Sequence, residues 1–337
     1  MSGRGLARIS LATGMLVAVL LAAGLAGCAG GSYDGPAAGE SRPAPAPPAG
    51  ATPVGVKLLY LFENERTQPY FPFEGLGGVA WGEDGTLVVC DEARGKVHGL
   101  DPRSLTWTEF DHPGSRPYRP VDAVVDGFKV LVLDIGGRAL HRFDLDGIHQ
   151  DRIVDFEALD PAFDTTPAAF DVDVDGRVVV ADGGEEQVIL LDSFLALQSR
   201  VGGPGPHREQ FSEPSGVVFL ANGGFLVADR GNRRLQRFNR LGYWEATWGG
   251  LFDADNPFVA PQGLARDHWG NVFVADPPLG VVHVLDARGE LLLDIGPGLD
   301  LKATPLGPVD VAVGPDDQLV VSDRLRGAVL VFRILYD

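Results

Sequence analysis

Aspartates are the residues of this sequence whose spacing most suggests a metal site. Asp171, Asp173 and Asp175 precede Gly176 in the order D-x-D-x-D-G, and Asp182 stands at the twelfth position. Alternating carboxylates before a glycine turn are the pattern of a calcium-binding loop. The bidentate Glu that closes such a loop is missing, and no helical pattern flanks it. We therefore treat Asp171, Asp173 and Asp175 as calcium candidates, with a strand, a turn and a second strand as the structural alternative.

Histidine is the second residue type in the sequence that can bind a metal or transfer a proton near neutral pH. His112 and His207 lie in polar segments and have no second ligand at metal-binding spacing. His98, His141 and His283 lie inside apolar segments, so we interpret them as packing residues. The signatures of phosphate-binding loops, zinc proteases, serine hydrolases and C-x-x-C sites are missing from the sequence. The residues alone therefore identify no catalytic centre.

These candidates belong to a repeat that must position them. An apolar run ending in Asp occurs six times, at intervals of 43 to 48 residues. The aspartates are Asp91, Asp134, Asp182, Asp229, Asp276 and Asp323. Repeats of this length suit a unit of four strands. An Asp at the end of a strand can accept backbone N–H bonds in the following turn, so we expect a structural role for all six.

Each unit contains the same parts in the same order. A Pro or a small residue precedes the first strand, a polar turn such as DVDG or ANGG follows, and the run ending in Asp comes next. A Gly-rich loop, a third strand, a second turn such as DLDG and a fourth strand complete the unit. The sequence holds 45 Gly and 25 Pro and lacks long helical periodicity, which predicts an all-β fold of short strands.

The fourth unit, from Phe211 to Gly249, resembles an NHL repeat nearly end to end, and the fifth unit matches well. The resemblance extends over residues 56–337 and implies a six-bladed β-propeller with four-stranded antiparallel blades. The sixth unit is one strand short, while Val56–Glu63 reads as a strand that belongs to no unit. We therefore expect this N-terminal strand to complete the last blade and close the ring.

The first strand of each propeller blade lines a central tunnel. The second residue after the repeated Pro is Gly or Ala in four units but Asp in two, at Asp122 and Asp310. Two carboxylates in a narrow tunnel can hold a cation or raise each other's pKa. The alternative is a water-lined tunnel that binds no ligand.

The loops between blades and the loops after the second strands should emerge on one face. These loops carry Arg and aromatic residues, which binding surfaces enrich. The ligand-binding candidates are Arg94, Tyr118, Arg119, Arg138, Arg230, Arg233 and Arg324, together with Asp122 and Asp310. The alternative is that Arg is common in NHL loops, and that the loop aromatics, which include Phe73, Phe252 and Phe258, plug the ends of the blades.

The first 27 residues have the layout of a secretory signal, with Arg4, Arg8 and no acid before an apolar stretch. The stretch ends in LAGC at Cys28, which resembles the lipobox of bacterial lipoproteins. The resemblance implies that Cys28 is acylated and becomes the new N-terminus. Ala29 in the next position implies the outer membrane of a Gram-negative cell envelope. Acyl chains on Cys28 would anchor the protein stably in the membrane.

The remaining chain divides into a tether and one domain. Residues 28–53 are rich in Pro, Ala and Gly and predict an extended tether, which leaves residues 54–337 for the propeller. Cys90 is the one other cysteine, so an internal disulfide is excluded. The net charge of −18 becomes −20 without residues 1–27 and disfavours nucleic acid as a partner.

Two functions from different classes fit this sequence. We favour a non-catalytic, monomeric binding platform that needs no cofactor and recognises a protein, a peptide or a glycan through its loop-rich face. The alternative is an exported lyase or lactonase that holds calcium or zinc at the tunnel mouth. Its candidate ligands would be Asp122, Asp310, His112 and His207. The clustered His of NHL-type lyases and the Glu, Asn and Asp ligands of lactonase propellers have no equivalents here that can be carried over.

Overall fold

The computed structural model describes residues 52–63, 73–101, 104, 106–114, 118–159, 161–162, 164–296, 299 and 306–337. The predicted signal peptide, Cys28 and nearly all of the predicted tether lie outside the described residues. Within the described part, no helix is long and apolar enough to cross a membrane.

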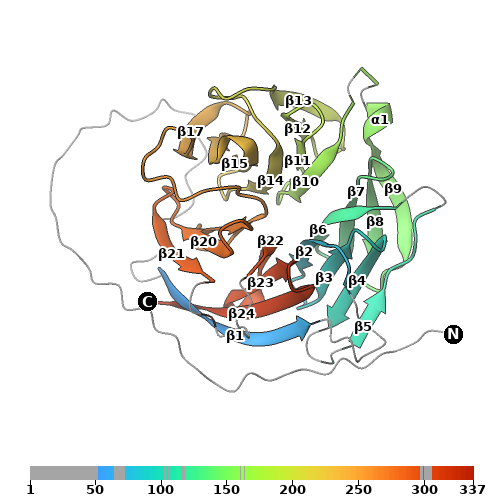
Figure 1. Ribbon diagram of the computed structural model, residues 1–337. Helices are drawn as coiled ribbons and strands as arrows, with labels where there is room; N and C mark the ends of the chain where they lie inside the picture. The colour runs from blue at the N-terminus through green and yellow to red at the C-terminus, as the bar shows by residue number, and fades with distance from the viewer. Residues whose placement is uncertain are drawn as a thin grey trace.

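The described chain forms six four-stranded antiparallel sheets, the blades, which confirms the predicted six-bladed β-propeller (Figure 1). Blades 1 and 2 comprise β2 (Leu76–Trp81), β3 (Leu87–Asp91), β4 (Lys96–Asp101) and β5 (Thr106–Glu109), then β6 (Pro120–Asp126), β7 (Lys129–Asp134), β8 (Ala139–Asp144) and β9 (His149–Asp155). Blades 3 and 4 comprise β10 (Pro167–Val172), β11 (Val178–Asp182), β12 (Gln187–Leu191) and β13 (Leu197–Gly202), then β14 (Pro214–Phe219), β15 (Phe225–Asp229), β16 (Arg234–Phe238) and β17 (Trp244–Gly249).

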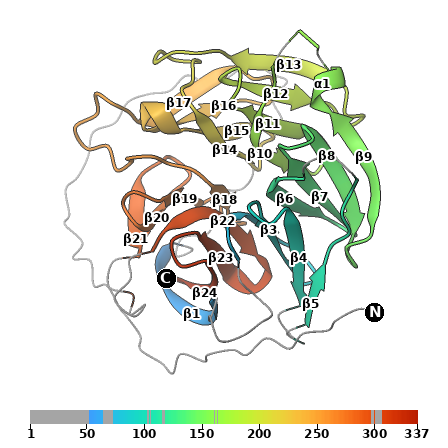
Figure 2. The same ribbon diagram turned by 45° about the vertical axis from the view of Figure 1, so that its right-hand side comes forward.

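Blade 5 comprises β18 (Leu264–Arg266), β19 (Val272–Asp276), β20 (Val281–Leu285) and β21 (Leu291–Ile295). Blade 6 comprises β22 (Pro308–Gly314), β23 (Gln318–Asp323), β24 (Ala328–Tyr336) and β1 (Pro53–Glu63). The short helices are α1 (Phe156–Leu159), η1 (Arg230–Asn232) and η2 (Pro315–Asp317). The first strands of the blades surround a common centre (Figure 2).

The N-terminal strand closes the ring as predicted. β1 pairs antiparallel with β24, from Pro53 opposite Tyr336 to Glu63 opposite Ala328. The blue β1 and the red β24 accordingly lie side by side in Figure 1. β1 begins at Pro53, one residue before the predicted domain boundary. This pairing covers the outer edge of β24, which would otherwise expose unpaired backbone groups.

Polar turns connect the strands within a blade. In the turn between β10 and β11, the Asp173 carboxylate accepts hydrogen bonds from the backbone N–H groups of Asp175 and Arg177. Gly176 completes this turn with φ 78°, a conformation that favours glycine. Because a blade is a meander, the turns after its first and third strands share one edge, the turn face. The loops after second strands and between blades share the opposite edge, the loop face.

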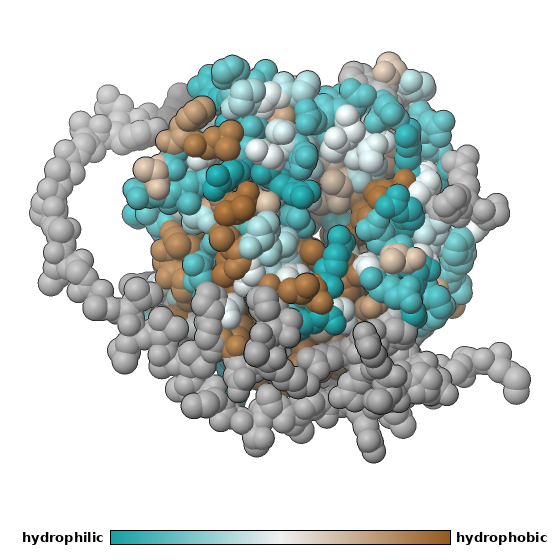
Figure 3. Space-filling model, viewed as in Figure 1, coloured by the Kyte–Doolittle hydropathy of each residue, from teal (hydrophilic) through white to brown (hydrophobic). Residues whose placement is uncertain are grey.

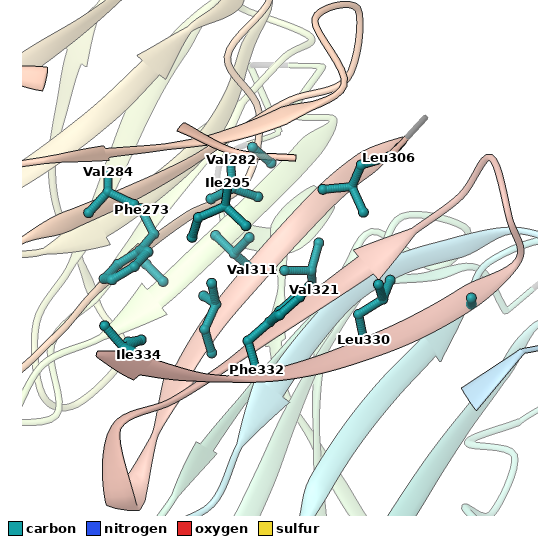
Figure 4. Close-up of a cluster of buried hydrophobic side chains, with 14 residues drawn as sticks. Phe273, Val282, Val284, Ile295, Leu306, Val311, Val321, Leu330, Phe332 and Ile334 are labelled. Atoms are coloured by element: carbon teal, nitrogen blue, oxygen red, sulfur yellow. The ribbon is translucent and has the colours of Figure 1, made fainter. Parts of the chain in front are cut away.

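The hydrophobic core is divided among the contacts between neighbouring blades. Between blades 5 and 6, one buried cluster contains Phe273 and Val284 of blade 5 together with Val311, Leu330 and Phe332 of blade 6 (Figure 4). Alternation along each strand places such side chains on the sheet faces that meet the next blade. Each large apolar side chain buried in this way contributes about 1.5–3 kcal/mol. The blades therefore stabilise one another through apolar contacts, without a disulfide among the described residues.

The six repeated aspartates have the predicted structural role. Asp134 is typical, because its carboxylate accepts backbone N–H bonds from Arg119, Gly136 and Gly137. Arg119 belongs to the loop that enters the blade, whereas Gly136 and Gly137 belong to the loop after the second strand. The aspartate therefore joins two loops of the loop face to the end of its own strand.

His98, His141 and His283 are buried, as expected of packing residues. Two of them have a further role that the packing interpretation missed. His141 Nε2 lies 3.6 Å from Asp134 Oδ2, and His283 Nε2 lies 3.6 Å from Asp276 Oδ2. Burial alone would lower the pKa of His283, but its contacts with Asp276 and Asp294 raise it above the ordinary value. These histidines therefore pair with repeated aspartates of the same blade.

Candidate binding site on the loop face

The first strands of the blades enclose a tunnel of about 1100 Å3. Small residues allow these strands to approach closely. A Cβ added to Gly263 would lie 2.1 Å from Asp310 Oδ1, and one added to Gly216 would lie 2.1 Å from the Gln262 carbonyl oxygen. Glycine is therefore required at these two positions by the space between neighbouring blades.

The tunnel carboxylates connect neighbouring blades. Asp310 Oδ2 in blade 6 accepts the Val79 N–H of blade 1 at 2.8 Å. Asp122 Oδ2 in blade 2 accepts the Phe170 N–H of blade 3 at 2.9 Å. Asp171 makes the same kind of bond, from blade 3 to the backbone of Phe219 in blade 4, at 2.7 Å. We call Asp122, Asp171 and Asp310 the bridging carboxylates.

The tunnel wall favours the protonated forms of these groups. Burial raises the pKa of Asp310 to about 7 and the pKa of Asp171 to about 6, although backbone N–H donors oppose both shifts. Burial also raises the pKa of Asp122, and the nearby Asp310 carboxylate raises it further. The pKa of the fully buried Cys90 thiol is raised by burial and by Asp122 and Asp310, so this thiol remains protonated.

The calcium candidates do not converge. Asp171 is a bridging carboxylate, Asp173 forms an ion pair with Arg177 at 2.6 Å, and Asp175 forms one with Arg240 at 2.9 Å. The described residues contain no group of three or more His, Cys, Asp or Glu arranged to hold a metal ion. The strand, turn and strand that formed the structural alternative are present at this place.

The ligand set of the metal-enzyme alternative is likewise dispersed. His112 lies in the loop between β5 and β6, where its ring meets the edge of Tyr118 at 5.2 Å. His207 lies in the loop between β13 and β14, and its carbonyl oxygen accepts a bond from Arg234. Both oxygens of Asp122 and one oxygen of Asp310 already accept backbone N–H bonds. These residues do not fit a shared calcium or zinc ion.

Three arginines instead gather beside the tunnel mouth, around Glu92. Arg119 forms an ion pair with Glu92, and Arg324 Nη2 lies 3.7 Å from Glu92 Oε2. Arg94 lines the same hollow of about 560 Å3 and pairs with Glu74 at 2.9 Å. Glu92 and Arg324 also line the tunnel, so the hollow adjoins its mouth. We call Arg94, Arg119, Arg324 and Glu92 the arginine notch.

Tyr118 forms part of the wall of this notch. Its side chain is 8% exposed, and its hydroxyl has no hydrogen-bond partner among the described residues. Burial raises its pKa well above the usual range, so the hydroxyl remains a donor. A buried hydroxyl without a partner is costly, and a ligand oxygen that reached it would remove this cost.

The structure thus brings together four of the predicted loop residues, Arg94, Tyr118, Arg119 and Arg324. The other three lie apart from the notch. Arg138 pairs with Asp164 at 2.6 Å, Arg230 lies 3.5 Å from Glu213, and Arg233 Nε donates to the Phe258 carbonyl oxygen. Arg230 does line the tunnel. Polar and apolar side chains are interspersed over the described surface in Figure 3.

The loop aromatics and Glu92 complete this description. Phe73 and Phe258 are buried, as the alternative of plugged blade ends expected, whereas Phe252 is fully exposed. Glu92 was missed from the sequence, although it directly follows the repeated Asp91. The same position in the repeat holds Arg230 in blade 4 and Arg324 in blade 6, so repeat alignment could have placed all three at the tunnel mouth.

Comparison with known proteins agrees with this architecture. The model of the NHL repeat matches residues 211–238. NHL repeat-containing protein 3 of Mus musculus is 35% identical over 105 residues, which cover 29% of this chain and 30% of that protein. The matched segment therefore spans about a third of the length of this curated relative.

Two solved structures share the fold over nearly their whole length. A streptogramin B lyase has a TM-score of 0.60 at 14% identity and covers 82% of this chain and 98% of its own. A gluconolactonase of Xanthomonas campestris has a TM-score of 0.60 at 18% identity, and the match covers 88% of this chain and 100% of the gluconolactonase chain. At such identities the likeness concerns the fold alone. The chain is therefore a six-bladed β-propeller that contains an NHL repeat at residues 211–238.

Proposed function

We propose that this propeller is an extracytoplasmic binding module, anchored to the membrane through Cys28, that recognises a carboxylate of a protein, peptide or glycan ligand. The arginine notch carries the proposal. Arg119 and Arg324 are each about half exposed and both turn toward Glu92, whose carboxylate stands where a ligand carboxylate would bind. Arginine pairs with carboxylates in a planar, bidentate geometry, which favours this ligand chemistry.

The surroundings of the notch support selective rather than general attraction of anions. The whole chain carries a net charge of −18, so it repels acidic ligands at long range. Arg94 is paired with Glu74, and Arg119 and Arg324 are paired with Glu92, so a ligand carboxylate would have to compete with these internal carboxylates. A ligand would therefore bind through a short acidic element placed in the notch, with the neighbouring loops contacting the rest of its surface.

The central experiment is crosslinking of a ligand on intact cells, using a photoreactive residue placed in the loop face. The double substitution Arg119→Glu and Arg324→Glu should reduce capture at least about tenfold, because each charged hydrogen bond contributes roughly 1.5–3 kcal/mol. Arg142→Glu is the matched control, since Arg142 is a similarly exposed arginine paired with Asp151 on an outer strand. Equal capture by the wild type and the notch variant would contradict the proposal.

Substitution of Glu92 provides a second test, in which ligand capture should rise instead of fall. Glu92→Gln removes the internal carboxylate that competes for Arg119 and Arg324. Ligand capture should therefore increase, while the thermal midpoint stays within a few degrees of the wild type. A fall in capture at an unchanged midpoint would mean that Glu92 contacts the ligand instead of standing in for it.

The membrane anchor is tested separately. Cells grown with a labelled fatty acid should incorporate the label into the wild-type chain but not into Cys28→Ser. The signal layout and the LAGC sequence support this expectation. An unlabelled wild-type chain would contradict the anchor without affecting the notch.

The metal-enzyme alternative keeps one supporting observation, the likeness of fold to a lyase and a gluconolactonase. Elemental analysis of protein purified without chelator distinguishes the two functions. About one calcium or zinc per chain would favour the enzyme over the binding module. A content far below one ion per chain would favour the binding module.

A further inference from the structure

The turn face of blades 2, 3 and 4 carries large apolar side chains at the tips of its turns. Val174 is fully exposed, and Phe128 and Phe194 are each 90% exposed. The set, which we call the apolar tips, consists of Phe128, Ile148, Val174, Phe194, Leu241 and Tyr243. Single exposed apolar residues are ordinary on protein surfaces, but a set confined to consecutive turns of one face requires an explanation.

The described turns of blades 1, 5 and 6 carry no large apolar side chain that is as exposed as these. Their tips carry Glu83 and Asp84 in blade 1, Arg288 in blade 5 and Asp316 in blade 6, and the Trp269 side chain in the first turn of blade 5 is partly buried. The exposed apolar tips therefore lie on one half of the turn face. Turns favour polar residues, so apolar tips are not a by-product of turn formation.

Hydrogen bonds hold the apolar tips in a fixed array. Arg177 Nη2 in blade 3 donates to the Gly223 carbonyl oxygen of blade 4 at 2.8 Å. Arg240 Nη2 in blade 4 pairs with Asp175 Oδ2 in blade 3 at 2.9 Å. The turn that carries Val174 is thus joined directly to the turn that carries Leu241, and the polar groups that join them lie beside these two apolar side chains.

This mixture indicates what the tips contact. The ion pair of Arg240 with Asp175 lies between Val174 and Leu241, so polar groups interrupt the apolar tips and leave no continuous apolar patch for a protein partner. A bilayer surface accepts isolated apolar and aromatic side chains between polar groups, because each side chain enters the acyl region separately. We propose that the apolar tips insert into the surface of a lipid bilayer.

The position of β1 is consistent with this orientation. Pro53 pairs with Tyr336, and the Tyr336 hydroxyl donates to Asp267 in the first turn of blade 5, so β1 begins at the turn face. The segment from Cys28 therefore joins the propeller on the face that carries the apolar tips, but at blade 6, across the ring from blade 3. This part of the inference rests on the proposed anchor. Two attachments across one face would lay the ring flat on the bilayer and direct the arginine notch away from it.

Fluorescence quenching in vesicles tests the contact on the full chain. Cys90 is buried and Cys28 is the proposed acylation site, so a new surface cysteine can be labelled selectively. Phe128→Cys and Phe194→Cys would each carry an environment-sensitive dye, in neutral phosphatidylcholine vesicles that contain nitroxide-labelled acyl chains. Leu325→Cys is the matched control, because Leu325 is an exposed apolar residue of the loop face.

Quenching at Phe128 and Phe194 should exceed quenching at Leu325 by about twofold or more, because nitroxides on acyl chains report only groups near the lipid. Equal quenching at all three positions would overturn the proposed contact. The mass of the purified chain reports acylation independently. An unacylated chain whose tips are still quenched would refute the anchor and support the contact of the tips with lipid. An acylated chain without preferential quenching at the tips would support the anchor and refute the contact.

Discussion

Blade 4 and blade 6 contain the same four-stranded ladder but are assembled differently. Blade 4 uses one continuous stretch, β14 to β17, and it is the blade that the NHL model matches. Blade 6 joins β22–β24 to β1 from the other end of the described chain. Its first strand also reaches blade 1 through the bond from Val79 to Asp310. Blade 4 can therefore form from one local stretch of chain, whereas closure of the whole ring depends on blade 6.

The largest expected effect comes from breaking blade 6. Deleting residues 54–64 removes β1, exposes the ladder edge of β24 and uncovers apolar groups such as Phe62. The loss should exceed about 5 kcal/mol, which is comparable to the whole stability of many domains. Denaturant unfolding measures it, with deletion of residues 29–52 as the control. Equal midpoints for the two deletions would refute closure by β1.

The next largest effect is expected inside blade 4. Asp229 accepts bonds from Ser212 N–H and from the side chains of Asn232, Arg234 and Gln236. Asp229→Ala would leave the buried Arg234 without its carboxylate and should cost about 3–5 kcal/mol.

Asp286→Ala is the matched control for Asp229→Ala. Asp286 also accepts two backbone N–H bonds in a turn, but it does so at the surface. Its loss should cost only about 1 kcal/mol. Similar losses of unfolding free energy in the two variants would mean that the side chains around Asp229 add no stability beyond that of an ordinary turn.

The equivalent change in blade 6 should be milder. Asp323 accepts backbone N–H bonds from Gly307 and Arg326, without the side-chain amides that surround Asp229. The buried Arg326 Nε lies 3.4 Å from Asp323 Oδ2, a longer contact than the 2.7 Å between Arg234 and Asp229. Asp323→Ala should therefore cost about 1–3 kcal/mol, as expected for buried donors left without an acceptor. Thermal unfolding of both alanine variants measures the difference, and a larger loss at Asp323 would reverse the proposed contrast between the blades.

The most gradual effect is expected from Asp310, where it should appear as a pH dependence rather than as a loss at one pH. Its pKa is raised to about 7, so the folded protein binds a proton that the unfolded chain releases near pH 4. Between these values the folded state holds more protons, and stability falls as pH rises, by at most about 1.4 kcal/mol per unit for this group. Asp310→Asn should flatten the fall. An unchanged slope in urea unfolding between pH 4 and pH 7 would contradict the shift.

The repeat made most of the fold predictable from the sequence. The apolar runs ending in Asp located the second strands, and the unpaired Val56–Glu63 segment identified the closing strand, because both signals are local and periodic. The structural role of the repeated aspartates followed from turn chemistry. Ligation by Asp171, Asp173 and Asp175 was an open alternative, since a sequence does not reveal that Arg177 and Arg240 face two of these carboxylates.

The candidate site was harder to predict because it is assembled from several blades. Arg94, Arg119 and Arg324 come from loops of blades 1, 2 and 6, and their convergence depends on which blades are neighbours. The role of Glu92 depends on side-chain directions within that convergence. Alignment of the repeats could have placed Glu92 and Arg324 at the tunnel mouth, but it does not show which side chains meet there. The apolar tips were missed for a related reason, because turn residues in separate blades become a set only when the ring places them on one face.

The pairing of β1 with β24 also sets an order of events during folding. β1 comes before every other strand of the described chain, and its partner β24 follows blades 1 to 5. Blades 1 to 5 can each form a ladder from one continuous stretch, but blade 6 must wait for both of its parts. Until then the folding chain exposes a strand edge at each side of the unfinished ring, where chaperones or identical chains could bind. Closure of the ring removes both edges in one step.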